Sequence, residues 1–127
     1  MTLILSVEDN KADQFLNRQM IKKFNPDAEV IEAYDGEEAL AYLQSGAPLP
    51  DIILLDINMP RMNGHDFLKA YAKNNERTEP PVVMLTSSQQ EADVEVMSTY
   101  TCVRDYWPKP LRDENFPKIQ EIIGINQ

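Results

Sequence analysis

An unbroken apolar run that ends in an acid is the strongest constraint on how this chain folds: Ile52-Ile53-Leu54-Leu55, followed by Asp56. Consecutive apolar residues bounded by polar ones are typical of a strand buried on both faces, as in a parallel sheet covered by helices. A charge that closes such a strand lies at its carboxyl end, the edge at which open α/β sheets bind ligands. The run therefore predicts both an α/β fold and the place of its functional site.

Strand-like runs alternate with helical patterns along the whole chain. The expected strands are residues 3–7, 29–34, 51–56, 81–86 and 104–108, the second and fifth at sheet edges. The expected helices are residues 9–24, 65–73, 90–100 and 113–123, with another that starts at Asp35 and stops at Gly46. Such alternation predicts a parallel sheet with right-handed crossovers. We expect a flavodoxin-like (βα)5 three-layer sandwich with a parallel five-stranded sheet in the order 2-1-3-4-5.

Apolar residues support the individual helices. The first helix is predicted from the helical spacing of Ala12, Phe15, Leu16, Met20 and Phe24. The third is expected to bury Phe67, Leu68 and Tyr71, and the fifth to bury Phe116, Ile119, Ile122 and Ile123.

Composition narrows the range of partners. The 127 residues are enough for one domain, and we expect residues 1–127 to form it alone. A net charge of −9 argues against binding to nucleic acid or to an anionic membrane, because both need a positive surface. No stretch approaches the ~20 apolar residues of a membrane span, and the single cysteine, Cys102, forms no internal disulfide. We expect a cytoplasmic protein.

Polar groups follow the other strands where they end. Glu8 and Asp9 follow the first strand, Thr86 closes the fourth, and Lys109 follows the fifth. Each alone has an ordinary explanation as a cap, a turn residue or a surface charge, but the fold would bring them together with Asp56. Oxygen ligands at one sheet edge suit Mg²⁺, and a carboxylate beside that ion can accept a phosphoryl group. Without a metal, the three acids repel one another, and at least one pKa should rise.

At this point the chain resembles the receiver domains of two-component response regulators. The resemblance rests on Glu8-Asp9-Asn10, Asp35-Gly36-Glu37-Glu38-Ala39-Leu40, Asp56-Ile57-Asn58-Met59-Pro60 with Gly64, Thr86-Ser87 and Lys109-Pro110. It implies that Asp56 receives a phosphoryl group from a sensor histidine kinase or a histidine phosphotransfer protein. Such a protein is no enzyme toward other substrates and catalyses only its own phosphorylation and dephosphorylation.

The resemblance also assigns roles to the remaining residues. Mg²⁺ would be held by Glu8, Asp9, Asp56 and the backbone carbonyl of Asn58. Thr86 and Lys109 would assist at the phosphoryl group, Thr86 and Tyr106 would form the switch pair, and the Lys109–Pro110 bond would be cis.

The organisation is similar to that of stand-alone receivers without an output domain, including phytochrome-associated regulators. The downstream partner is not named by the sequence. Many relatives dimerise through helix four, strand five and helix five, so a homodimer through that face is expected as one option. Residues 100–105 depart from the family pattern there, since the usual Gly-Ala pair is absent. Trp107 is expected to pack rather than to anchor a partner.

Three other classes of protein fit the sequence less well. A small Mg²⁺-dependent phosphatase could use Asp56 as nucleophile, but its usual acid two positions later is replaced by Asn58, which cannot donate a proton in that way. A nucleotide-binding module would need glycines after the first strand, and none is present there. A receiver that signals without phosphorylation would not need the complete set of acids, Thr86 and Lys109.

Overall fold

The described residues form one five-stranded parallel sheet. The computed structural model describes residues 2–56, 64–75, 80–86, 100 and 102–125. The strands are β1 (Leu3–Val7), β2 (Glu29–Ala33), β3 (Ile52–Asp56), β4 (Val82–Thr86) and β5 (Val103–Pro108). All neighbouring strands are parallel, and their order is β2-β1-β3-β4-β5. The predicted order is confirmed, and so are the edge positions of β2 and β5.

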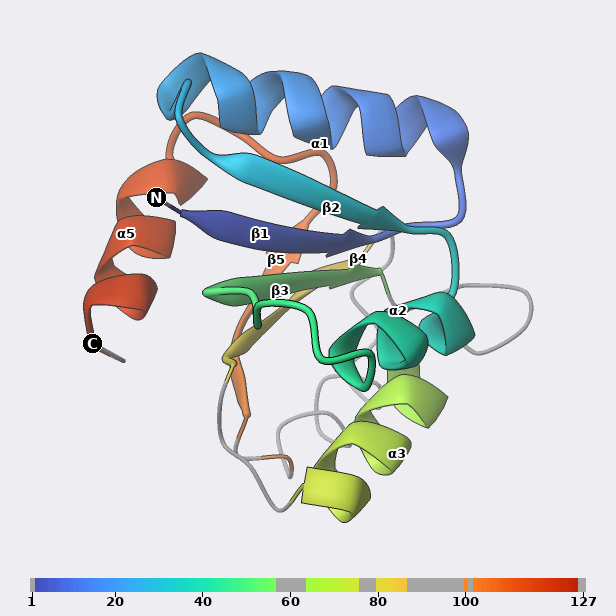
Figure 1. The fold of residues 1–127 in the computed structure, drawn as a ribbon. Helices are drawn as coiled ribbons and strands as arrows, with labels where there is room; N and C mark the ends of the chain where they lie inside the picture. Colours follow the sequence, from blue (N-terminus) through green and yellow to red (C-terminus); the bar gives the residue numbers. More distant parts are fainter. Residues whose placement is uncertain (1, 57–63, 76–79, 87–99, 101, 126–127) are drawn as a thin grey trace.

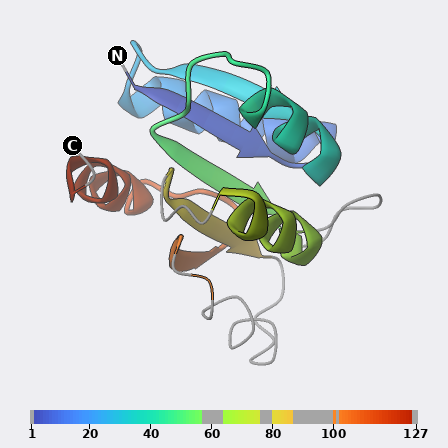
Figure 2. The same cartoon turned by 60° about the horizontal axis from the view of Figure 1, so that its bottom comes forward.

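Helices cover both faces of this sheet (Figure 1). They are α1 (Lys11–Phe24), α2 (Gly36–Leu43), α3 (Gly64–Asn75) and α5 (Asn115–Ile125). Helices α1 and α5 lie on one face, and α2 and α3 lie on the other (Figures 1 and 2). The three-layer sandwich is therefore confirmed for the described part of the chain. The helix expected at 90–100 lies outside the described residues.

Side chains of the central strands alternate between two hydrophobic cores. Ile52 and Leu54 join the core under α1 and α5, whereas Ile53 and Leu55 join the core over α2 and α3. Every residue of β3 is buried, as expected for a strand covered on both faces. The predicted buried residues of α3, namely Phe67, Leu68 and Tyr71, are in the second of these cores.

The buried face of helix α1 differs from the one that the sequence predicted. The helix begins at Lys11 rather than at residue 9, because Asn10 caps it and accepts a hydrogen bond from the Asp13 amide at 3.0 Å. The residues that predicted it are largely outside, with exposed fractions of 59% for Phe15 and 49% for Leu16. Its buried residues are Gln14, Asn17 and Ile21. Two of these are polar, so an apolar pattern could not reveal the buried face.

Helix α2 follows its predicted boundaries closely. Asp35 caps the helix, and its Oδ1 accepts a hydrogen bond from the Glu38 amide at 2.9 Å. The last helical residue is Leu43, and Gly46 follows with a φ of +85°, in the left-handed region that glycine tolerates. The expected stop at Gly46 therefore falls just after the helix.

The edge strand β5 contains one extra residue. Val82 pairs with Val103, but Val83 pairs with Asp105, so Arg104 forms a bulge. After the bulge, Tyr106 packs half-buried against the core of α2 and α3, and Trp107 is buried in the core of α1 and α5. The Trp107 indole N–H donates to an Asp105 carboxylate oxygen at 2.9 Å. The expectation that Trp107 packs is confirmed.

Candidate functional site

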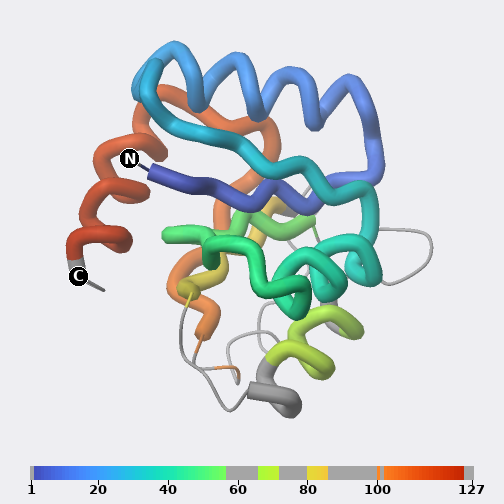
Figure 3. The backbone as a smooth tube through the Cα atoms, viewed as in Figure 1, coloured from blue at the N-terminus to red at the C-terminus, as the bar shows by residue number. Residues whose placement is uncertain are grey.

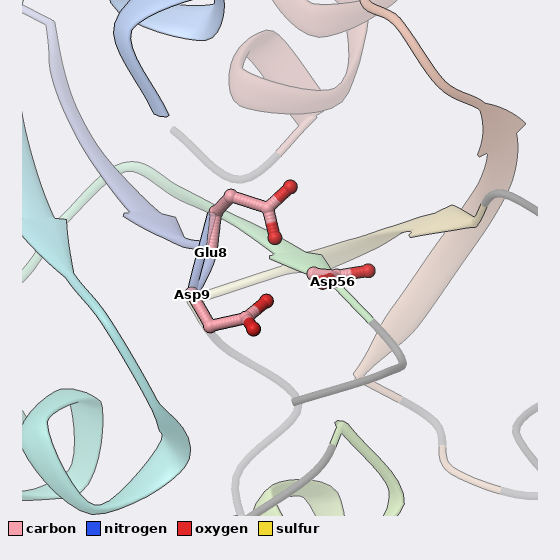
Figure 4. Close-up of side chains that lie close together, drawn as sticks. All are labelled: Glu8, Asp9 and Asp56. Atoms are coloured by element: carbon pink, nitrogen blue, oxygen red, sulfur yellow. The ribbon is translucent and has the colours of Figure 1, made fainter. Parts of the chain in front are cut away.

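The carboxyl ends of the two central strands bring three acids together. Strands β1 and β3 run side by side (Figure 3). In their register, Val7 lies opposite Leu55. Glu8 and Asp9 follow β1, and Asp56 is the last residue of β3, so their side chains share one edge. Figure 4 shows the three carboxyl groups gathered there. One ligand oxygen from each residue lies within 4.8 Å of the others.

Burial distinguishes the three acids. Glu8 is 1% exposed and Asp56 is 3% exposed, whereas Asp9 is partly exposed. The Glu8 amide donates to Ala33 O of β2 at 2.9 Å, which continues the sheet pairing by one residue beyond β1. Two of the carboxyl groups at this sheet edge are therefore buried, and the third, that of Asp9, is accessible to solvent.

Lys109, which follows the edge strand β5, contacts the acids. Its Nζ lies 2.5 Å from Glu8 Oε1, 3.2 Å from Asp56 Oδ1 and 3.5 Å from Asp13 Oδ2. The Lys109–Pro110 peptide bond is cis, as the resemblance implied. One ammonium therefore contacts acids that follow or end two different strands and one on the first turn of α1.

The surroundings shift the pKa of both Glu8 and Lys109. Burial and the adjacent Asp56 raise the pKa of Glu8 from 4.5 to about 9, although Lys109 opposes the shift. Burial lowers the pKa of Lys109, but the contacts with Glu8 and Asp56 outweigh it and raise that pKa above 10.5. The rise predicted for at least one acid is confirmed at Glu8, and Lys109 remains an ammonium.

The arrangement fits a divalent cation. The three carboxylates together with Lys109 would carry three negative charges against one positive, which leaves a charge of −2. In addition, Glu8 Oε2 is buried without a hydrogen-bond partner among the described residues. A buried carboxylate oxygen that accepts no hydrogen bond is costly unless a proton or a cation satisfies it. Oxygen ligands with this charge suit a hard ion such as Mg²⁺ or Mn²⁺.

The other predicted site residues are only partly placed. Thr86 is the last residue of β4, which adjoins β3, and its backbone pairs with Pro108. The structure describes the backbone of Thr86 but not its side chain, and Asn58 lies outside the described residues. Tyr106 lies on β5, two positions before Pro108. The strand ends thus bring Glu8, Asp9, Asp56 and Lys109 together, and the backbone of Thr86 lies on the strand next to Asp56.

Two residues near the site were missed by sequence reasoning. Asp13 contacts Lys109, and Gln14 is fully buried with hydrogen bonds to the ends of β1 and β2. The spacing of Gln14, Asn17 and Ile21 by three and four residues marks one helix face. Two polar residues at such positions were a signal that the face contacts polar groups.

The sequence of the chain matches a known protein family over nearly its whole length. The family model for the response regulator receiver domain matches residues 4–121. The chain belongs to that family. Receiver domains of this family act in phosphorelay signalling, with histidine kinases or phosphotransfer proteins as partners, and this assignment disfavours the phosphatase alternative.

Among curated relatives, response regulator Rcp1 from Synechocystis is 40% identical over 97 residues, which are 72% of this chain and 66% of Rcp1. The transcriptional regulatory protein CpxR from Escherichia coli is 37% identical over 115 residues, which are 89% of this chain and 45% of CpxR. The chain therefore spans less than two thirds of the length of either relative.

Solved structures extend the similarity to the whole chain. The Mn²⁺-bound form of Rcp1 superposes with a TM-score of 0.77 at 34% identity and covers 99% of this chain and 92% of that one. The phosphorylated cyanobacterial phytochrome response regulator RcpA gives a TM-score of 0.78 at 32% identity, covering 98% and 91%. The resemblance to phytochrome-associated regulators is thereby confirmed. Divalent metal binding in a relative agrees with the acidic cluster seen here.

None of the described helices has the length and apolar character that crossing a membrane requires.

Proposed function

We propose that Asp56 accepts a phosphoryl group from a phosphohistidine and that the chain is a response regulator controlled by this modification. One observation carries the proposal. A carboxyl group that is 3% exposed lies 3.2 Å from an ammonium and within 4.8 Å of two further acids. The surrounding charges hold this carboxyl group in place, and they could bind the oxygen atoms of an incoming phosphoryl group and a cation that accompanies it.

Asp56 supplies the nucleophile. One of its carboxylate oxygens forms a bond to phosphorus while the bond from phosphorus to the histidine nitrogen breaks, and that nitrogen keeps the electron pair. Lys109 follows the transferred charge, because its flexible ammonium can turn from Glu8 to the phosphoryl oxygens without leaving Asp56. The product is an acyl phosphate on Asp56.

Glu8, Asp9 and Asp56 would hold Mg²⁺, together with the backbone carbonyl of Asn58. When bound, Mg²⁺ neutralises charge on the transferring phosphoryl oxygens. Glu8 would give up its proton to serve as a ligand, because its raised pKa of about 9 favours the protonated form near neutral pH.

The conformational response would involve Thr86 and Tyr106. The Thr86 hydroxyl would donate to a phosphoryl oxygen, and Tyr106 would turn further into the core. Tyr106 is half-buried against the core of α2 and α3, so a turn inward would bury more of its ring. Phosphorylation then biases an equilibrium between two arrangements rather than creating a new one.

The surface for the phosphodonor is supplied by α1. Phe15 and Leu16 are 59% and 49% exposed, and they follow Asp13, whose carboxylate lies 3.5 Å from Lys109. Large exposed apolar side chains beside a site are typical of a protein contact. The histidine donor would approach Asp56 while its apolar residues cover this end of α1.

Phosphorylation by acetyl phosphate and Mg²⁺ tests the proposal. The wild-type chain should gain one acid-stable, base-labile phosphoryl group, detected by intact mass. Asp56→Asn should gain none, whereas Asp113→Asn, which changes an exposed acid two residues before α5, should label normally. Labelling of Asp56→Asn at another residue would refute the site assignment. Repeated turnover on a phosphomonoester would instead favour the phosphatase.

Three further expectations belong with this proposal. A stand-alone receiver of residues 1–127, located in the cytoplasm, stays a prediction. A homodimer through strand β5 and helix α5 also stays a prediction, and the helix expected to complete that face lies outside the described residues.

A further inference from the structure

Gln14 has an unusual place for a helical glutamine. It is 0% exposed, in the middle of the contact between α1 and the sheet. Its amide oxygen accepts a hydrogen bond from the Ser6 hydroxyl at 2.5 Å. Its amide nitrogen donates to Ser6 O at 3.0 Å, Ala33 O at 3.1 Å and Glu8 O at 3.3 Å. A single side chain thus ties α1 to the ends of both β1 and β2.

One of these contacts reaches the peptide that joins the two acids. Glu8 is held through its amide by Ala33 O at 2.9 Å and through its carbonyl by Gln14. Its carbonyl belongs to the peptide that leads into Asp9. The direction in which both acids project therefore depends on a backbone that Gln14 fixes.

Three carbonyl oxygens determine which way the Gln14 amide faces. Because these oxygens only accept hydrogen bonds, Nε2 faces them, and Oε1 accepts the hydrogen bond that the Ser6 hydroxyl donates. Oε1 in the reversed orientation would face carbonyls that donate nothing. The pair is therefore a fully satisfied polar contact inside an otherwise apolar layer, and such contacts specify one arrangement.

We propose that Gln14 is a positioning residue for the acidic pair: by fixing the Glu8–Asp9 peptide, it sets the affinity of the site for a divalent cation. The proposal deepens the proposed function, because it concerns the same cation site. Residues that orient metal ligands without touching the ion commonly change metal affinity 10- to 100-fold when they are replaced, so a change of about that size is expected here.

The test compares three variants of the full chain. Gln14→Met keeps the length of the side chain but removes every hydrogen bond. Ser6→Ala keeps Gln14 and its contacts with the carbonyl oxygens but removes the hydrogen bond to Oε1. Ile21→Ala is the matched control, because it leaves a cavity two turns further along the same buried face of α1 without touching the strand ends.

Two measurements are needed, neither of which depends on phosphorylation. The first is the dissociation constant for Mn²⁺, from calorimetry on folded protein. The second is hydrogen exchange at the amides of Glu8 and Asp9 in metal-free protein, normalised to the exchange of β3 amides. Normalisation separates local loosening from a general loss of stability.

We expect Gln14→Met to raise the Mn²⁺ dissociation constant about tenfold or more and to speed exchange at Glu8 and Asp9 relative to β3. Ser6→Ala should have a smaller effect in the same direction, and it keeps the test decisive if Gln14→Met does not fold. Ile21→Ala should leave the dissociation constant within about twofold of wild type, because distant sites act independently.

The idea is overturned if Gln14→Met and Ser6→Ala bind Mn²⁺ as tightly as wild type, or if Ile21→Ala weakens binding as much as they do. Failure of the proposed function looks different. In that case acetyl phosphate would not label wild-type Asp56, while the ranking of the variants in Mn²⁺ affinity would still support the positioning role.

Discussion

The affinity of the site for Mg²⁺ should depend steeply on pH, because Glu8 holds a proton in the metal-free protein. Its pKa of about 9 lies well above neutral pH, so most molecules have Glu8 protonated at pH 7. The cation binds the ionised form and displaces the proton. The apparent dissociation constant should therefore fall about tenfold for each unit of rising pH, until about pH 9.

The direction of the effect follows from linkage. Glu8 has a higher pKa in the folded protein than its ordinary 4.5, so the folded state binds the proton more tightly. Without metal, the stability that this proton contributes is complete below about pH 4.5 and is lost as the pH rises toward about 9, with a slope of at most about 1.4 kcal/mol per pH unit. Chelation of Mg²⁺ should thus destabilise the protein most at alkaline pH.

Calorimetry in two buffers with different ionisation enthalpies measures the affinity and counts the released protons. Near neutral pH, about one proton should be released for each Mg²⁺ bound. Glu8→Gln, which keeps the shape and removes this titration, should release none. Equal affinities at about pH 6.5 and about pH 8.5, with no proton release in wild type, would refute the role given to Glu8.

Three further changes test other parts of the molecule. Thr86→Ala should leave labelling of Asp56 by acetyl phosphate largely intact but weaken the accompanying change in Trp107 fluorescence; a full fluorescence response would contradict the switch role. Phe15→Ser should slow phosphoryl transfer from a histidine phosphotransfer protein but not from acetyl phosphate, whereas Leu49→Ser, at an exposed apolar residue before β3, should change neither rate. Asp35→Ala should lower the free energy of unfolding in urea by about 1 kcal/mol because α2 loses its cap, and Glu37→Ala, at an exposed residue, should cost less.

The sequence was sufficient to predict the fold and the acids of the site. Strands β1, β3 and β4 are apolar runs, and the acids stand where two of these runs end, so the parallel topology alone places Asp56 next to Glu8 and Asp9. The contact of Lys109 with Glu8 follows in the same way, although the two residues are far apart in the chain. These features depend on local patterns and on one rule about where parallel strands end.

Other features depend on contacts that no local pattern records. Gln14 is buried because three strand-end carbonyls and a hydroxyl satisfy its amide, and none of those partners is visible from its neighbours in α1. Because the face of α1 that contains Gln14 packs on the sheet, Phe15 and Leu16 lie on the exposed face. The bulge at Arg104 likewise results from pairing with β4, and the composition of β5 does not reveal it.

The alternation of Tyr106 and Trp107 along β5 has a mechanical consequence. Adjacent residues of this edge strand fill opposite cores, and Lys109 follows them within three positions. A displacement of the strand near Lys109 therefore disturbs the packing on both sides of the sheet at once. Since β4 alone pairs with it among the described strands, we expect β5 to shift more easily than an interior strand. We therefore expect a movement of Lys109 at Asp56 to be transmitted through β5 to the helices on both faces of the sheet.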